Sequence, residues 1–222
     1  MSDPDIAASV TSASPNGLAF SQELNGFFLA SYTGLAGGSK LAFFNMSDNI
    51  TTTLGVLAEA AGNAAMHQGA YWYVGQRSDH LRRVVVDMAS LTITSDILVA
   101  SMTNGTRQLD FGDIDFDASG LLYLTAQQFD PAQRRDTQRM LATYDIAQNI
   151  FDVVRIGPSA DSSVAYLGQV AAGPGGSLFV QDGYNGAVYA INKSTGALLS
   201  TAPLLASHVF TDLASGIICG AG

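Results

Sequence analysis

The sequence predicts an all-β fold in which one four-stranded unit repeats along a single domain. Its 222 residues are 47% hydrophobic, which is enough to bury a sizeable core. Four segments share the same order of short strand, turn and second, aromatic-rich strand, and this order recurs about every 45 to 55 residues. No long stretch carries the 3.6-residue period of an amphipathic helix.

Each copy opens with a predicted β-hairpin. Its two strands are residues 17–20 and 25–30 in the first copy, 63–66 and 69–74 in the second, 113–116 and 119–124 in the third, and 169–172 and 175–180 in the fourth. A glycine lies at or beside each turn, and this arrangement is typical of a hairpin.

A third strand, a polar turn and a weaker fourth strand complete each copy. The third strands are residues 40–44, 81–86, 140–145 and 187–191, and the fourth strands are residues 50–57, 91–98, 150–156 and 197–204. Residues 127–139 form the longest predicted loop. Four antiparallel strands repeated at this spacing are the sequence form of a β-propeller blade.

The two ends of the chain predict a fifth blade. Residues 212–215 and 217–219 repeat the first two strands and then stop, and residues 6–11 would supply an outer strand that closes the ring and protects its edges. We therefore expect one domain, 1–222, with five four-stranded blades. Their bounds are roughly 12–57, 58–104, 105–160, 161–205, and 206–222 plus 5–11. A truncated piece of a larger propeller is the alternative.

Two stretches resemble known propeller families. Residues 112–123 resemble the inner hairpin of NHL-like and gluconolactonase-like propellers, and residues 188–197 are similar to the third strand and turn common in them. The resemblance covers nearly the whole chain and is specific for architecture rather than for one family. Since propellers serve as binding modules, hydrolases, lactonases and scaffolds, it leaves the function open.

The first strand of each blade is expected to line a central channel. The leading residues of these strands are Gly17, Asn63, Asp113, Gln169 and Asp212, and two positions later come Ala19, Ala65, Asp115, Ala171 and Ala214. Strand alternation places both sets on one side, so the alanines suit a crowded axis and the polar oxygens converge near it. Oxygen-rich rings of this kind suit Ca²⁺ or ordered water.

The resemblance to gluconolactonase-like propellers implies a divalent metal at the channel mouth that polarises the substrate. On that basis Asp113 and Asp212 are the metal ligands to test, with Asn63 and Gln169 completing the set. The sequence departs from this pattern, because Gly17 has no side chain and the ring contains no glutamate. The alternative is that these groups only hydrogen-bond water and neighbouring backbone.

Four further residues are candidates for ligand binding. His67 follows an inner strand near the channel mouth, Asp115 lies beneath the ring, and Tyr32 and Tyr184 lie in loops after second strands, where exposed rings would stack on a ligand. No nucleophile elbow, P-loop or His-Glu-x-x-His motif is present, and the three histidines lack zinc-site spacing. We therefore assign no catalytic residue.

Composition limits the partners. With 19 acidic and 10 basic residues the net charge is -9, which argues against nucleic acid. No apolar run is long enough to predict a membrane-spanning helix. Charged residues are only 13%, so the surface is largely neutral and polar. Such a surface is common outside cells, although the chain begins without a signal-peptide pattern and a cytoplasmic location is the alternative.

The preferred interpretation is a non-enzymatic binding or structural module at a cell surface or outside the cell. It would take protein or carbohydrate partners, and self-assembly is a further expectation. The alternative is a metal-dependent hydrolase of the lactonase or esterase kind that uses the axial site. A lectin with one sugar site per blade is disfavoured, because the loop residues differ between blades.

Overall fold

A computed structural model describes residues 15–31, 38–76, 78–102, 109–130, 135–157, 167–173, 177–182 and 186–199. Every regular element in these ranges is a β-strand. They contain no helix long and apolar enough to cross a membrane.

The strands form four antiparallel sheets, each in simple chain order. The first sheet contains β1 (Pro15–Ser21), β2 (Gly26–Ser31), β3 (Lys40–Asn45) and β4 (Ile50–Val56). The second contains β5 (Ala61–His67), β6 (Ala70–Gly75), β7 (His80–Asp87) and β8 (Thr92–Ser101). The third contains β9 (Leu109–Phe116), β10 (Leu122–Asp130), β11 (Arg135–Asp145) and β12 (Ile150–Gly157). The fourth contains β13 (Leu167–Ala172), β14 (Ser177–Asp182) and β15 (Val188–Asn192), with an isolated bridge from Ile191 to Leu198.

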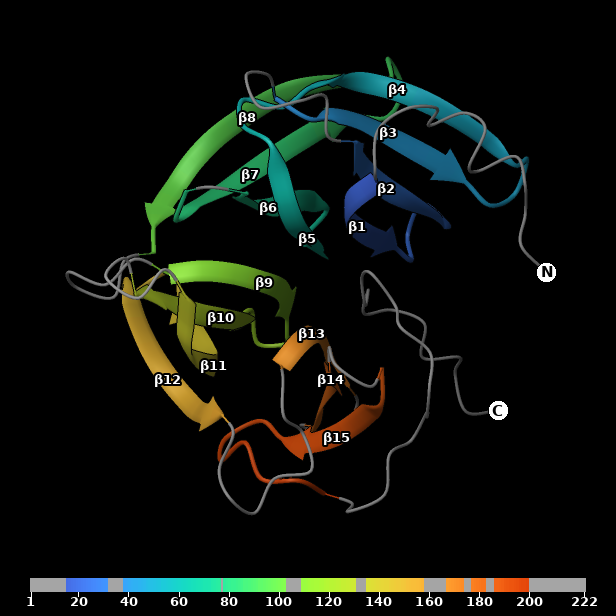
Figure 1. Ribbon diagram of the computed structural model, residues 1–222. Coiled ribbons are helices and arrows are strands. Elements are labelled where there is room, and N and C mark those ends of the chain that lie inside the picture. Colours follow the sequence, from blue (N-terminus) through green and yellow to red (C-terminus); the bar gives the residue numbers. More distant parts are fainter. Residues whose placement is uncertain are drawn as a thin grey trace.

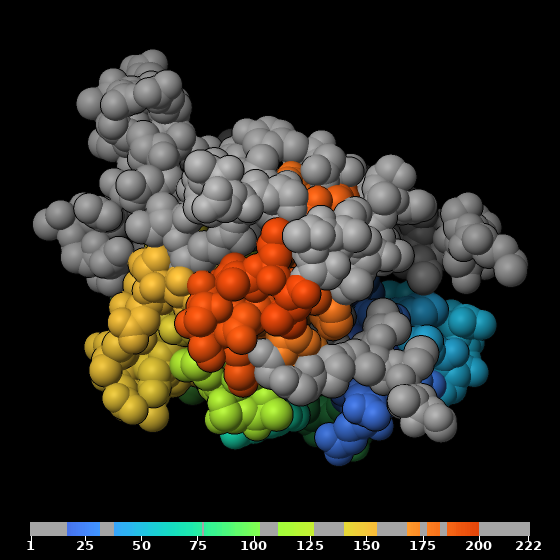
Figure 2. Space-filling model, turned by 90° about the horizontal axis from the view of Figure 1, so that it is seen from below, coloured from blue at the N-terminus to red at the C-terminus, as the bar shows by residue number. Residues whose placement is uncertain are grey.

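The sheets are the blades of a β-propeller, as predicted. Figure 1 shows them following one another around a common centre, with β1, β5, β9 and β13 innermost and β4, β8 and β12 outside. Successive inner strands contact one another. In Figure 2 the ring is seen from the side of blade 4, whose orange and red atoms lie beside the yellow atoms of blade 3.

The structure describes four blades, not the five predicted. The predicted fifth blade falls on residues 206–222 and 5–11, which lie outside the described residues, so closure by the N-terminal strand is not part of the described fold. Of the fourth strand predicted at residues 197–204, the structure describes residues 197–199, where Leu198 forms a bridge to Ile191, and the rest lies outside the described residues. The predicted loop at residues 127–139 is instead largely strand, because β10 runs to Asp130 and β11 starts at Arg135.

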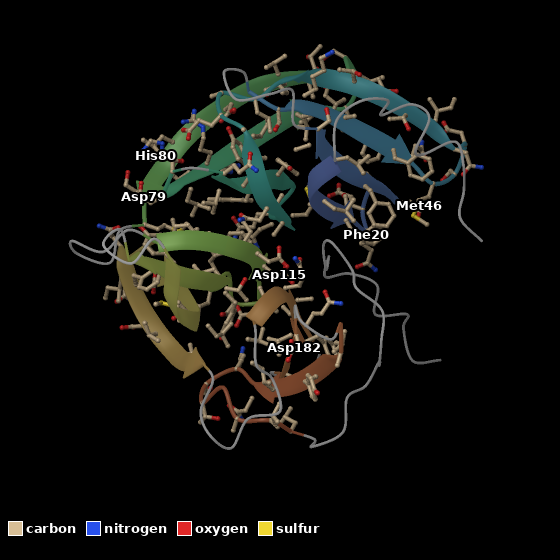
Figure 3. All side chains as sticks on the ribbon, viewed as in Figure 1. Phe20, Met46, Asp79, His80, Asp115 and Asp182 are labelled. Carbon is tan, nitrogen blue, oxygen red and sulfur yellow. The ribbon has the colours of Figure 1, made fainter. Side chains whose placement is uncertain are left out.

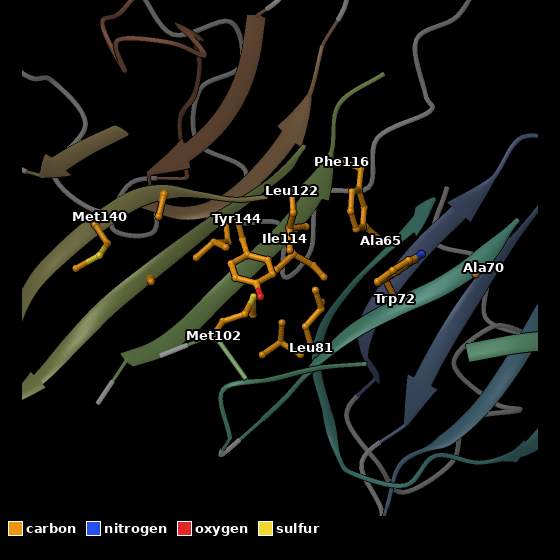
Figure 4. Packing of buried hydrophobic residues seen from close by; sticks show 14 residues of the cluster. Ala65, Ala70, Trp72, Leu81, Met102, Ile114, Phe116, Leu122, Met140 and Tyr144 are labelled. Atoms are coloured by element: carbon orange, nitrogen blue, oxygen red, sulfur yellow. The ribbon is translucent and has the colours of Figure 1, made fainter. Parts of the chain in front are cut away.

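The hydrophobic core lies between neighbouring blades. One cluster fills the junction of blades 2 and 3, where Trp72, Leu81, Ile114, Phe116 and Tyr144 are all buried (Figure 4). Similar clusters fill the junctions of blades 1 and 2 and of blades 3 and 4. Each blade therefore depends on its neighbours for burial of its apolar faces.

Candidate functional site

The two inner-strand aspartates bind the backbone of the next blade. Asp113 Oδ2 accepts the Val170 N–H at 2.9 Å and its Oδ1 accepts the Ile114 N–H at 2.9 Å. Asp115 repeats the pattern: its Oδ2 accepts the Ala172 N–H at 2.6 Å and its Oδ1 accepts the Phe116 N–H at 2.8 Å. Both aspartates are buried, with 1% and 2% exposure, and Asp115 lies on the inner side of the ring (Figure 3).

This arrangement has a clear structural purpose. β9 and β13 are the inner edges of two different sheets, and an edge strand presents N–H groups that its own sheet cannot pair. Buried N–H groups need acceptors. The two carboxylates supply them through charge-assisted hydrogen bonds, which are stronger than neutral ones. Asp113 and Asp115 therefore join blade 3 to blade 4.

Further side-chain hydrogen bonds reach the backbone of a neighbouring blade, here with the side chain as donor. Asn63 Nδ2 donates to the Phe111 carbonyl at 3.4 Å, and Thr125 Oγ1 donates to the Gly168 carbonyl at 3.2 Å. Between blades 1 and 2, the Tyr71 hydroxyl donates to the carbonyl of Gly17 at 2.7 Å. Sequence reasoning missed the roles of Tyr71 and Thr125, because their acceptors lie 54 and 43 residues away.

The conformation of Gly17 explains why the predicted ring has no side chain there. Its φ is +63°, in the left-handed region that favours glycine. A Cβ at Gly17 would lie 2.8 Å from the Tyr71 hydroxyl oxygen. Glycine at this position thus permits the hydrogen bond that joins blades 1 and 2.

The predicted metal ligands are only partly described. Asn63, Asp113 and Gln169 lie on inner strands β5, β9 and β13, as expected, whereas Asp212 lies outside the described residues. Asn63 is 3% exposed, and its Oδ1 is a buried oxygen without a hydrogen-bond partner. Within the described ranges no group of three or more His, Cys, Asp or Glu side chains is placed to hold a metal.

These residues do not make a complete site for Ca²⁺, which takes about six to eight oxygen ligands. Asn63 on inner strand β5 has one buried amide oxygen without a hydrogen-bond partner, and such an atom usually binds a water or a cation. The carboxylates of Asp113 and Asp115 already accept backbone N–H groups with both oxygens. In the described part of the chain, the inner-strand residues therefore fit interblade support better than chelation.

A pocket lies at the junction of blades 2 and 3, on the side of the ring that carries the β5–β6 and β9–β10 turns. Its volume is about 560 Å³, within the range usual for small-molecule sites. Its walls come from the end of β5 and the following turn, from β6, from the β9–β10 turn and from the β11–β12 turn. The lining residues are His67, Gln68, Trp72, Ser119, Gly120, Leu121, Asp145, Ile146 and Ala147.

His67 is the predicted ligand residue that the structure places in this pocket. It ends β5, and the next two residues, Gln68 and Gly69, have φ of +50° and +68°, the signature of a type I′ hairpin turn. Its ring stacks on Phe116 with centroids 4.3 Å apart and an interplanar angle of 13°. Burial lowers the pKa of His67, and the charge of Asp117 opposes this shift only in part. The lowered pKa favours the neutral form of the imidazole.

An ion pair supports the β9–β10 turn, which lines the pocket. Asp117 Oδ2 accepts from Lys193 Nζ of blade 4 at 2.7 Å, and its Oδ1 accepts the N–H groups of Ser119 and Leu121 at 2.9 and 3.1 Å. Burial raises the pKa of Asp117, but the bonds from Lys193 and the β9–β10 turn outweigh it and the net shift is downward. The pocket wall is thus tied to two blades.

A third polar cluster lies where blade 2 meets the chain arriving from blade 1. Glu59 accepts from Ser78 Oγ at 2.7 Å and from Arg82 at 3.1 Å, and it lies 2.9 Å from His80 Nδ1. Arg82 also donates to Asp96 at 2.8 Å. Figure 3 shows His80 at the outer end of blade 2. Because Ser78 faces Glu59 rather than the His80 ring, the cluster lacks the serine–histidine contact of a hydrolase triad.

The two predicted stacking tyrosines, Tyr32 and Tyr184, lie outside the described residues. Two pocket residues that the sequence analysis did not single out are Gln68 and Asp145. Their turn positions are visible in the sequence, but their convergence with His67 depends on how two blades pack.

Comparisons with known proteins identify the fold alone. No protein-family model matches the chain, and no curated protein sequence matches it significantly. Similar solved structures include a chain of the nidogen/laminin complex (12% identity, TM-score 0.52), a gluconolactonase from Xanthomonas campestris (14%, 0.54) and the calcium-binding protein regucalcin from Agrobacterium tumefaciens (11%, 0.51). The matches cover 85%, 85% and 84% of this chain. This chain in turn spans 79%, 61% and 57% of the length of those three chains. The chain is a β-propeller whose neighbours include gluconolactonase-like and nidogen-complex structures, in line with the predicted resemblance.

Proposed function

We propose that the protein is a non-enzymatic binding module, acting at a cell surface or outside the cell, that takes a protein or glycan partner. The observation that carries this proposal is the use of Asp113 and Asp115. A metal-dependent hydrolase would need these axial carboxylates for its ion, yet both bind the backbone of β13. A concave surface suited to a ligand lies instead at the junction of blades 2 and 3.

The comparisons are compatible with this proposal without deciding it. One similar chain comes from a complex between nidogen and laminin, which is a protein partnership. Others are a gluconolactonase and a calcium-binding protein. Since all share under 15% identity with this chain, the choice rests on its own residues.

A second candidate is a metal-dependent lactonase or esterase, favoured by one observation. Asn63 Oδ1, on inner strand β5, is buried and has no hydrogen-bond partner. In this alternative Asn63, Asp113, Gln169 and Asp212 would hold Ca²⁺, which would supply Lewis-acid polarisation of a substrate carbonyl. Their amide and carboxylate oxygens are of the kind that a hard cation binds.

The two candidates are separated by a thermal-shift titration with Ca²⁺, Mg²⁺, Mn²⁺ and Zn²⁺, with chelator controls, on the parent and on Asp113→Asn. An ion at about 100 times its dissociation constant would add about 2.7 kcal/mol of stability. The binding module predicts no saturable shift and no ion-dependent hydrolysis of lactones or esters. A saturable shift that Asp113→Asn removes, together with such hydrolysis, would replace the proposal by the second candidate.

A further inference from the structure

We propose that the pocket between blades 2 and 3 binds a neutral sugar residue, one hexose-sized ring with its apolar face inward. This inference rests on the proposed binding function and names the ligand class of that site. It follows from the floor of the pocket, from its rim and from the charges around it.

The floor is apolar and firmly supported. Trp72, Leu121, Ile146 and Ala147 supply apolar surface to the pocket. Trp72 is only 6% exposed, and its indole N–H donates to the His67 carbonyl at 3.1 Å. Its ring meets Phe116 edge-on with centroids 5.3 Å apart (Figure 4). A rigid floor of this kind matches the C–H face of a sugar ring, which packs on apolar and aromatic surface.

The rim carries both donors and acceptors. The Gln68 amide offers both, and neutral His67 offers one donor and one acceptor nitrogen. Ser119 donates its hydroxyl to Asp117, so toward a ligand it acts as an acceptor. Asp145 Oδ1 accepts the Gln148 N–H at 3.0 Å, which uses one of about four acceptor positions on that carboxylate. Sugar hydroxyls, which donate and accept at once, match this mixture.

The surrounding charges favour a neutral ligand. Asp145 on the rim and the net charge of -9 oppose an anion. A cationic ligand would pair with the Asp145 carboxylate, but two positive side chains nearby would repel it. Lys193 is paired with the neighbouring Asp117, and the Arg83 guanidinium carbon lies 6.0 Å from the Trp72 ring. A purely apolar ligand would cover the polar rim without replacing its hydrogen bonds to water.

The chain supplies matched controls for a test. The β11–β12 turn begins Asp145-Ile146-Ala147, and the β7–β8 turn of blade 2 begins Asp87-Met88-Ala89 in the same position. Ala147 and Ala89 are both exposed, but only Ala147 lines the pocket. Ala147→Trp would fill the pocket from an exposed turn, and Ala89→Trp places the same bulk outside it. Asp145→Asn and Asp87→Asn form a second pair.

The test is saturation-transfer NMR followed by calorimetry with the methyl glycosides of glucose, galactose, mannose and N-acetylglucosamine. We expect at least one glycoside to bind, Asp145→Asn to weaken it about tenfold through loss of a hydrogen bond to a charged group, and Ala147→Trp to abolish binding. Ala89→Trp and Asp87→Asn should bind like the parent. Circular dichroism and melting curves of all four variants establish that each is folded.

Three results would overturn the inference. They are failure of every glycoside to bind, unchanged binding by folded Ala147→Trp, and stronger pocket binding of butylammonium or glucuronate than of any glycoside. None of these results contradicts the proposed binding function. That proposal would be contradicted separately, by ion-dependent hydrolysis that Asp113→Asn abolishes.

Discussion

Replacing Asp115 by asparagine tests whether the inner-strand carboxylates hold the blades together. The carboxylate accepts the Ala172 N–H at 2.6 Å and the Phe116 N–H at 2.8 Å while being only 2% exposed. Asparagine keeps the shape but has one acceptor oxygen, so its amide NH₂ would face a backbone N–H. One charge-assisted hydrogen bond is lost and one buried N–H is left unpaired, which costs about 2 kcal/mol.

The assay is equilibrium unfolding in urea, carried out once with chelator and once with Ca²⁺. Asp115→Asn should lower the free energy of unfolding by about 2 kcal/mol in both conditions without changing the denaturant slope. The control is Asp48→Asn, because Asp48 lies in an exposed turn where its Oδ1 accepts the Ile50 N–H at 3.0 Å. That change should stay within about 0.5 kcal/mol. The reasoning fails if the two variants are equally stable, or if the loss at Asp115 requires Ca²⁺.

Three further predictions concern single contacts. Tyr71→Phe removes the hydrogen bond to Gly17 and should destabilise the fold by about 1 kcal/mol in urea unfolding; an unchanged midpoint would contradict that role. The pKa of Asp117 is lowered from 3.8 and that of Lys193 is raised from 10.5. The ion pair should therefore stop stabilising the fold when the pH falls through the lowered pKa of Asp117 or rises through the raised pKa of Lys193. Lys193→Met should reduce both losses in melting temperature, and retention of both would refute the pairing. Burial lowers the pKa of His67 below 6.5, so stability should decrease as pH falls through 6.5, and His67→Gln should remove that decrease from the melting curves; an unaltered pH profile would show that His67 is not the group responsible.

The blades could be predicted because their signals are local. The β5–β6 hairpin is encoded by Gln68-Gly69 between two apolar strands, and both turn residues adopt positive φ. The hairpin of β10 and β11 was harder to predict. Residues 127–139 are polar and contain a proline, which resembles a loop, yet Gln127 pairs with Arg139 in the sheet. Backbone pairing needs no apolar side chain, so composition underestimates the length of such strands.

The inner-strand residues show where sequence reasoning ends. Alternation placed Asp113 and Asp115 on one side of β9, but it could not distinguish an ion on the axis from a neighbouring backbone as their partner. Their acceptor roles involve N–H groups 57 residues away, and only the packing of one blade on the next brings these together. The same holds for the pocket, whose walls come from turns of two blades.

The repeat explains why one pocket, rather than one per blade, is the expected site. The second-strand residue that pairs with Ala19, Ala65, Asp115 or Ala171 of the inner strand is aromatic in every described blade: Phe28, Trp72, Tyr123 and Phe179. The position at the end of the inner strand differs in each: Ser21, His67, Asp117 and Gly173. The scaffold is thus repeated while the chemistry of the turns is not, because packing constrains the first position in every blade and leaves the second free. A ligand that needs a neutral imidazole beside an indole therefore finds both only at blade 2, and calorimetry should give one sugar bound per chain at this pocket.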